Sequence, residues 1–298
     1  MSTEPSLPGA ADALFGRLFD DASLFPPGDL PMRAAVAGHQ RHGSAWYRDL
    51  TGPFVCPQTR LGELGAALTA ANIPEIDLAL VVTGGAAAVA AATDSVAADP
   101  RLRLRAIEVP ASPASGAGHS ARDVAAALDG ALLAGAACYI EIPAGFLTDQ
   151  AAADAVLALI DGRGYRVKLR TGGLTAAAFP DESTLAACLT AVTTRRVPFK
   201  CTAGLHHAVR HTADTGTKLE QHGFLNVLLA VGAAVAGADP RHVAAALAQR
   251  DPAVVVEQIL ALDADTTAEI RSMFTSFGTC STDEPIADLT SLGVLSQP

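Results

Sequence analysis

The chain has 298 residues, of which 50% are hydrophobic and 17% are charged, and its formal net charge is -10. A chain of this length buries a large core without help from disulfides or structural metals. The acidic balance disfavours a nucleic-acid or anionic-membrane partner, because either would require a basic surface, and no basic patch is present in the sequence.

The sequence also predicts a cytoplasmic protein. The first twelve residues lack the basic and then apolar pattern of a signal peptide. The two uncharged stretches, 78–93 and 223–238, are shorter than the roughly 20 apolar residues that a membrane-spanning helix needs. The five cysteines include no CxxC pair, which suits reduced thiols better than a disulfide framework.

Short apolar runs alternate along the chain with alanine-rich segments of helical periodicity. This alternation is typical of a parallel β-sheet covered by helices. We expect strands at 22–25, 54–57, 76–82, 102–109, 138–142, 165–169, 197–201 and 275–280. We expect helices between them at 62–71, 86–92, 120–133, 148–160 and 183–194, and a closing helix that starts near Asp283.

Eight strands are enough to close a barrel, so the predicted fold is α/β, a single (β/α)8 TIM-type barrel over residues 1–298. The segment 205–274 is longer than one helix requires, and we interpret it as a helical insertion before the last strand. Its expected helices are 223–236, 240–249, 252–262 and 266–273.

The distribution of lysine points to chemistry. Of the 21 basic residues only three are lysines, and two of them, Lys168 and Lys200, lie near the ends of neighbouring predicted strands. Arginine replaces lysine at most surface positions, but it cannot act as an amine nucleophile. Burial and a neighbouring cation lower the pKa of a lysine, which allows it to form a Schiff base. The alternative is that both lysines reach solvent or pair with Glu108 and Glu141.

Glycine turns follow both lysine strands. Thr171-Gly172-Gly173 and Ala203-Gly204 can present backbone N–H groups to a phosphate or carboxylate, and Arg170 can add a fixed charge. Turn geometry alone also explains such glycines. Asp20 and Asp21, near the first strand, can hydrogen-bond into the barrel or cap a loop.

Several motifs, taken in order, resemble the 2-deoxyribose-5-phosphate aldolases and, more broadly, the class I aldolase barrels. The matching segments are Asp20-Asp21-Ala22-Ser23-Leu24, Phe54-Val55-Cys56-Pro57, Lys168-Leu169-Arg170-Thr171-Gly172, Lys200-Cys201-Thr202-Ala203-Gly204 and Phe277-Gly278-Thr279-Cys280-Ser281. The phrases Leu24-Phe25-Pro26-Pro27 and Phe277-Gly278-Thr279-Cys280 also resemble a group of bacterial proteins of unassigned role.

The aldolase resemblance implies that Lys168 forms the Schiff base, that Lys200 is the second lysine, and that the Gly278 and Thr279 turn helps to hold phosphate. The chain departs from the family pattern in three places. Arg170 replaces a serine, Asp21 replaces a histidine, and the acidic residue of the fourth strand is Glu108, not aspartate. The insertion before the last strand is also atypical.

A histidine cluster supports a second hypothesis. His206, His207 and His211 follow the Lys200 strand, and the i, i+4 spacing predicts that His207 and His211 share a helix face, which suits zinc. No Glu of an HExxH motif is present, which disfavours a metalloprotease. His206 and His207 can instead contact substrate as acid, base or orienting groups. Cys201 and Cys280 also lie at strand ends and could face the site.

The preferred interpretation is a carbon–carbon lyase that acts through a lysine Schiff base on a small anionic carbonyl substrate, with no metal and no organic cofactor. The expected catalytic residues are Lys168, Lys200, Glu108 and Glu141. The expected substrate-binding residues are Arg170, Thr171, Gly172, Gly173, Gly204, His206, His207, Gly278 and Thr279. The alternatives are a metal-dependent hydrolase or lyase and a non-catalytic barrel that binds a small anion. The alanine-rich helices are compatible with a homo-oligomer.

Overall fold

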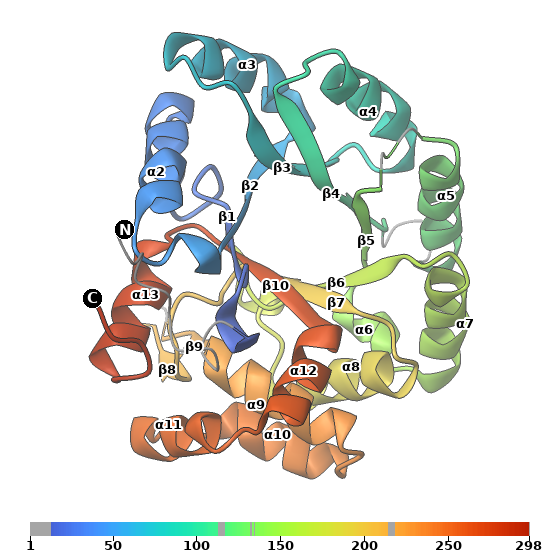
Figure 1. Ribbon diagram of the computed structural model, residues 1–298. Coiled ribbons are helices and arrows are strands. Elements are labelled where there is room, and N and C mark those ends of the chain that lie inside the picture. Colours follow the sequence, from blue (N-terminus) through green and yellow to red (C-terminus); the bar gives the residue numbers. More distant parts are fainter. Residues whose placement is uncertain (1–12, 113–116, 132, 134, 214–217, 298) are drawn as a thin grey trace.

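The computed structural model describes residues 13–112, 117–131, 133, 135–213 and 218–297. Within these residues, eight parallel strands form a closed barrel surrounded by helices (Figure 1). The predicted (β/α)8 TIM-type fold is therefore confirmed. Around the barrel the strands are β1 (Phe19–Asp21), β10 (Phe274–Thr279), β7 (Phe199–Thr202), β6 (Arg166–Arg170), β5 (Ala137–Glu141), β4 (Leu102–Pro110), β3 (Ile76–Val81) and β2 (Thr51–Pro57).

The helices lie outside the strands and cover their outward faces (Figure 1). They are α2 (Met32–Ser44), α3 (Leu61–Ala70), α4 (Val89–Ala97), α5 (Ala117–Asp129), α6 (Ala144–Leu147), α7 (Gln150–Asp161), α8 (Glu182–Thr194), α9 (Phe224–Val235), α10 (Pro240–Ala248), α11 (Pro252–Leu260), α12 (Ala264–Met273) and α13 (Asp283–Ser291). Short 3-10 turns occur at Arg48–Leu50, Gln58–Arg60, Ala86–Ala88 and Ala176–Ala178. No helix of the described residues has the length and apolar character to cross a membrane.

Alternation along the strands separates the helix-facing core from the barrel interior. In β6, Val167 and Leu169 belong to the hydrophobic core that includes helix side chains, so the intervening Lys168 points into the barrel. Part of the interior is apolar and is filled by Ala22, Val55, Ala79, Val81, Ala106 and Tyr139. The rest of the interior carries charge.

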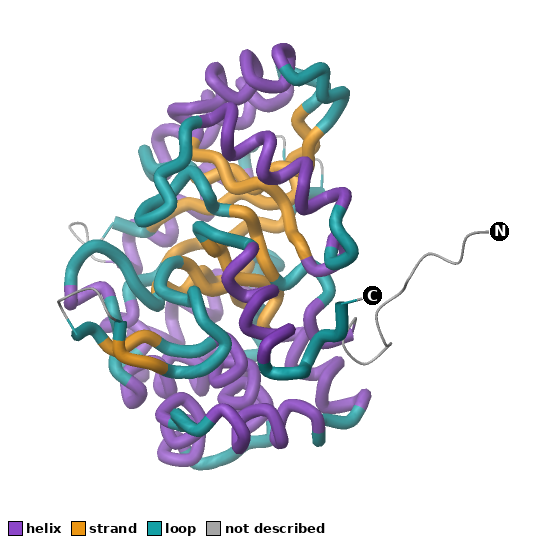
Figure 2. The backbone as a smooth tube through the Cα atoms, turned by 90° about the vertical axis from the view of Figure 1, so that its left-hand side faces the viewer, coloured by secondary structure: helices purple, strands orange, loops and turns teal. Residues whose placement is uncertain are grey.

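The segment 205–274 contains more than helices. A two-stranded antiparallel hairpin, β8 (His211–Thr212) with β9 (Glu220–Gln221), precedes α9 and lies at one end of the barrel (lower left in Figure 2). Helix α9 packs against α8, α10 and α12, so it covers the barrel wall, and α10 and α11 form the outermost layer (Figure 1). The predicted insertion is thus largely helical, with helices close to the expected boundaries.

Two local predictions differ from the structure. The first strand is Phe19–Asp21, and the predicted strand at 22–25 is wrong because these residues form a turn. The two buried carboxylates Asp20 and Asp21 interrupted the apolar pattern and concealed this strand. Helix α2 was also missed, because it contains several polar residues and begins without a side-chain cap.

Candidate active site

Lys168 and Lys200 lie side by side in the barrel interior. They are direct register partners on the parallel strands β6 and β7. Their side chains are 4% and 1% exposed, so neither reaches solvent. The predicted placement of the two lysines on adjacent strands is confirmed, and the alternative in which they extend to solvent is not what the structure shows.

A buried carboxylate joins the two lysines. Glu108 Oε2 lies 2.7 Å from Lys168 Nζ, and Glu108 Oε1 lies 2.6 Å from Lys200 Nζ. Beyond them, Lys200 Nζ donates to Asp20 Oδ2 at 2.5 Å, and Lys168 Nζ lies 3.1 Å from Glu141 Oε2. Arg170 Nε donates to Glu141 Oε1 at 2.9 Å. These six side chains, Asp20, Lys200, Glu108, Lys168, Glu141 and Arg170, are called the charged row below.

The ionisation of the charged row follows from how many partners each carboxylate has. Burial would raise the pKa of Glu108, but two lysine ammonium groups lower it to about 2. Asp20 contacts one lysine only, and burial leaves its pKa above the ordinary value despite that contact. Burial of Glu141 is likewise outweighed by Lys168 and Arg170, which lower the pKa of this carboxyl. The row therefore contains a carboxylate that is ionised at neutral pH, Glu108, between two lysines.

Two adjacent lysines are expected to lower each other's pKa, and for Lys200 this prediction is wrong. Burial does favour its neutral form, but the carboxylates of Asp20 and Glu108 outweigh burial and raise the pKa of Lys200. Lys200 is therefore a fixed cation. Pairing with Glu108 and Glu141, named as the alternative for the lysines, is what the structure shows for Lys168.

The low pKa of Glu108 predicts a pH dependence of stability. A carboxylate with a lowered pKa in the folded state stabilises the protein above its unfolded pKa, ordinarily 4.5, and loses that contribution as the pH falls toward about 2. We expect the difference in unfolding free energy between wild type and Glu108→Gln to shrink over this range. Urea unfolding at a series of pH values measures it, and a difference that stays constant between about pH 6 and pH 3 would contradict the assignment.

The glycine turns after β6 and β7 pack against each other. A Cβ on Gly172 would lie 2.6 Å from Gly204 Cα, and Gly204 has a φ of +75°. Thr171 is buried, and its hydroxyl donates to the carbonyl of Ala203 at 2.5 Å. A Cβ on Gly173 would meet the Ala178 side chain at 2.8 Å. Close packing of the two loops thus accounts for these glycines, and their contact with an anion stays a prediction.

Gly172→Ala is expected to lower the free energy of unfolding by about 1–3 kcal/mol, because the added methyl meets backbone that cannot move aside. Gly43, in α2, is the matched control, since a Cβ there meets nothing within 4 Å. Gly43→Ala should be neutral or stabilise by up to about 1 kcal/mol. Urea unfolding compares the two variants, and equal stabilities would refute the close packing.

The other expected substrate-binding residues lie around the carboxyl end of the barrel. The side chain of Arg170 is 45% exposed while it pairs with Glu141. Gly278 lies opposite Thr202, at the ends of β10 and β7. The Thr279 hydroxyl donates to the carbonyl of Ser281 at 3.0 Å, so it closes a local turn.

The three histidines do not form a common ligand set. His206 Nδ1 lies 3.2 Å from Glu284 Oε2, whereas His207 Nδ1 lies 3.1 Å from Asp288 Oδ2. The helix predicted for His207 and His211 is wrong, because His211 begins β8, although the two rings pack edge to face at 4.5 Å. The metal hypothesis on His206, His207 and His211 is therefore corrected.

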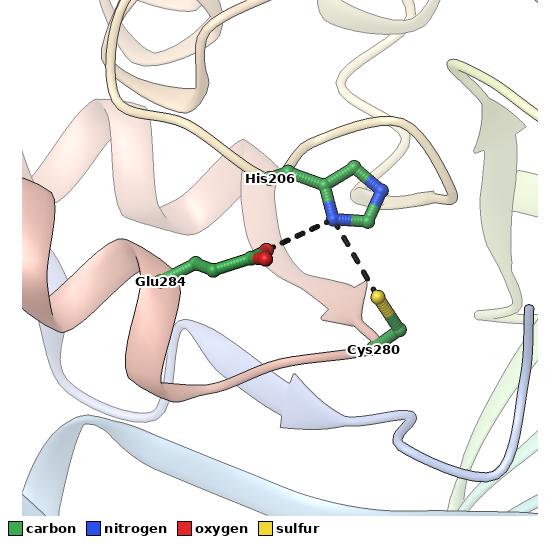
Figure 3. Close-up of side chains that lie close together, drawn as sticks. All are labelled: His206, Cys280 and Glu284. Carbon is green, nitrogen blue, oxygen red and sulfur yellow. Dashed lines mark hydrogen bonds and ion pairs between the residues drawn. The ribbon is translucent and has the colours of Figure 1, made fainter. Parts of the chain in front are cut away.

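Cys280 provides the other contact of His206. Its Sγ lies 3.6 Å from His206 Nδ1, and Glu284 approaches the same nitrogen from α13 (Figure 3). Burial favours the neutral ring of His206, but its hydrogen bonds to Cys280 and Glu284 raise its pKa to about 9. Cys201 instead belongs to the helix-facing core, and burial raises the pKa of its thiol.

A cavity of about 450 Å³ lies at the opposite, amino-terminal end of the strands. Its lining includes Arg17, Asp77, Arg105, Tyr139 and Arg166, and it reaches Asp20 and Lys200 but not Lys168. Arg166 stacks on the Tyr139 ring, with its guanidinium carbon 5.6 Å from the ring centroid, and donates to the Tyr139 hydroxyl at 3.1 Å. This cavity thus reaches the charged row at Asp20 and Lys200.

Sequence reasoning named Asp20 as a candidate for the interior but left it out of the catalytic set, and it missed Tyr139 and Ser276. Asp20 Oδ2 accepts a hydrogen bond from the Ser276 hydroxyl at 2.8 Å. Lys200 Nζ lies 5.4 Å from the Tyr139 ring centroid. The neighbouring Asp21 acts as the loop cap, because it accepts the Ser23 N–H and contacts His39 of α2. If β1 is assigned correctly, the alternation of side chains along a strand places Asp20 and Asp21 on opposite faces of it.

Neither protein-family models nor curated protein sequences match this chain, so the resemblance to the aldolases stays a prediction from the short motifs given above.

Proposed function

We propose that this barrel is a class I aldolase-like carbon–carbon lyase that acts on a small anionic carbonyl substrate through a Schiff base on Lys168. The observation that carries the proposal is the pair of buried lysines on adjacent strands that share one buried carboxylate, Glu108. A (β/α)8 barrel is compatible with such an enzyme. Because this fold hosts many chemistries, the proposal depends on the residues of the site.

The reaction begins when the neutral amine of Lys168 attacks the carbonyl carbon, and the carbonyl oxygen leaves as water. The protonated imine then withdraws electrons from the bond between the α and β carbons, which breaks as the β-hydroxyl loses its proton to water, giving an enamine and a second carbonyl product. Protonation of the enamine carbon and hydrolysis of the imine return the free amine. All of the covalent chemistry is supplied by lysine and water.

The charged row supplies the proton and the charge balance. Glu141, the more exposed of the two carboxylates that contact Lys168, accepts the proton that the amine loses and exchanges it with solvent. Glu108 stays ionised and stabilises the positive charge of the imine. Lys200, held as a cation by Asp20 and Glu108, balances the charge of Glu108 from its other side.

The substrate's anionic group is assigned to the carboxyl end of the barrel. Arg170 offers a partly exposed guanidinium there, next to the turn at Thr171 and Gly172. Because the Lys168 side chain is 4% exposed, the substrate reaches the amine only when the loops at this end move apart.

Solvent-exchange spectroscopy tests the enamine directly. In D2O, the protein should catalyse incorporation of deuterium at the carbon next to the carbonyl of a small ketone or aldehyde phosphate, observed by NMR. A panel of such carbonyl compounds should include at least one that exchanges. Absence of exchange for every member of the panel would reject the proposal.

One observation favours a second candidate, a barrel that binds a small anion without turnover. The cavity at the amino-terminal end is lined in part by Arg17, Arg105 and Arg166. Arg17 and Arg105 pair with Asp77, at 3.3 and 2.8 Å. Calorimetric binding of a di- or tricarboxylate that is lost in Arg166→Ala but kept in Lys168→Arg would support this candidate over the lyase.

A further inference from the structure

A thiol, an imidazole and a carboxylate meet at the carboxyl end of the barrel (Figure 3). Cys280 directly follows β10, His206 lies in the loop after β7, and Glu284 is in the first turn of α13. One possible ligand atom from each lies within 4.8 Å of the others, and this is the one such group of three in the part of the chain that the structure describes.

The two distances from His206 Nδ1 are close to the ligand separations of a tetrahedral metal site. Tetrahedral zinc with ordinary bond lengths separates a nitrogen and an oxygen ligand by about 3.3–3.4 Å, and a nitrogen and a sulfur ligand by about 3.6 Å. Here His206 Nδ1 lies 3.2 Å from Glu284 Oε2 and 3.6 Å from Cys280 Sγ. The two contacts of His206 thus have nearly the ligand separations of a tetrahedral ion, and one ligand atom from each side chain lies within 4.8 Å of the others.

Hydrogen bonding alone serves this arrangement poorly. Both the sulfur and the carboxylate approach the same nitrogen, His206 Nδ1, so a single N–H would have to be shared between two acceptors in a weaker three-centre hydrogen bond. The usual catalytic chain, in which one imidazole nitrogen takes the thiol proton and the other holds the carboxylate, is absent here. A cation between the three groups would satisfy all of them.

The cluster is also held in place by its surroundings. A Cβ on Gly28 would lie 2.9 Å from the Cys280 carbonyl oxygen and 3.1 Å from Cys280 Cβ, so the loop after β1 packs tightly on this cysteine. The side chain of His206 is 16% exposed, whereas that of Glu284 is 43% exposed. The fold thus fixes His206 and Cys280, whereas the more exposed Glu284 lies on the solvent side of the cluster, from which an ion would enter.

We propose that His206, Cys280 and Glu284 bind a divalent transition metal of the zinc class, with the fourth coordination position open. Binding displaces the thiol proton of Cys280 and any proton on His206 Nδ1 to solvent, and forms one bond each from nitrogen, sulfur and oxygen. Three protein ligands with one open position characterise catalytic and exchangeable zinc sites more than structural ones. The site goes beyond the proposed lyase, because it uses none of the charged row.

Cobalt substitution of the full-length, chelator-treated protein tests the site. Addition of Co²⁺ should give one equivalent of bound metal and a thiolate-to-cobalt charge-transfer band, which Zn²⁺ should displace. Cys280→Ser should abolish the band, and His206→Ala should weaken binding at least about 10-fold. The matched control is Cys138→Ser on β5, a buried thiol in contact with the Ala136 carbonyl, which should leave the band unchanged.

Three results would overturn the proposal: less than stoichiometric binding, a spectrum without the thiolate band, or a band that survives Cys280→Ser. A folding defect in Cys280→Ser is detected separately by circular dichroism, and Glu284→Gln then provides a second variant at an exposed ligand, with weaker binding expected. Lys168→Arg should bind cobalt as the wild type does. Failure of the metal site and failure of the Schiff-base proposal are therefore distinguishable.

Discussion

Replacement of Glu108 by alanine is expected to lower the free energy of unfolding by about 3–5 kcal/mol. The reason is that Glu108 neutralises two ammonium groups in the barrel interior, at 2.7 Å from Lys168 and 2.6 Å from Lys200. Its loss leaves two buried cations with only Asp20 and Glu141 to balance them. Urea unfolding of the wild type and the variant at neutral pH measures the effect.

The matched control for this prediction is a carboxylate in an exposed ion pair. Glu269 lies 3.1 Å from Arg196 at the surface, so Glu269→Ala should cost less than about 1 kcal/mol. Glu108→Gln should be less destabilising than Glu108→Ala, because the amide keeps the volume and one acceptor oxygen. A Glu108→Ala variant as stable as Glu269→Ala would show that the interior charges are not coupled as the structure indicates.

Lys168→Arg is expected to eliminate catalysis while it preserves the fold. Arginine keeps the positive charge that Glu108 and Glu141 require, but it does not lose its proton and cannot form an imine. Because enzymes accelerate reactions by about 10⁶-fold or more, loss of the covalent step should reduce turnover by at least about 10⁴-fold. Deuterium exchange into the carbonyl substrate, followed by NMR, provides the rate.

Lys218→Arg is the control for that experiment. Lys218 is the third lysine of the chain and is exposed in the loop before β9, so its replacement should leave the rate unchanged. Comparable unfolding free energies for the two variants would show that the loss is chemical. Retention of exchange by Lys168→Arg would exclude Lys168 as the nucleophile.

The barrel itself could be predicted from the sequence because seven of its strands are apolar runs bounded by Gly, Pro or polar residues. The scarcity of lysine likewise pointed to Lys168 and Lys200, and the register between β6 and β7 places them together. The first strand could not be recognised, since Asp20 and Asp21 look like loop residues until the partners that satisfy them are known. Those partners, Lys200 and His39, lie far away in the sequence.

The direction in which the pKa of Lys200 shifts could not be predicted from the sequence either. Two neighbouring lysines alone would lower each other's pKa, whereas Asp20 and Glu108 together raise that of Lys200. Similarly, the spacing of His207 and His211 carried no information about Cys280 and Glu284, which come from the far end of the chain to meet His206. The contact of His206 with Cys280 follows from the pairing of β10 with β7, not from local pattern.

Borohydride trapping tests the central claim most directly. The protein is incubated with a panel of small aldehydes and phosphorylated sugars, reduced with borohydride, and analysed by intact and peptide mass. The account predicts a single reduced adduct on Lys168 that is absent from Lys168→Arg. An adduct on Lys200 would keep the chemistry and reverse the two lysine roles, whereas no adduct on either lysine with any carbonyl would contradict the Schiff-base mechanism.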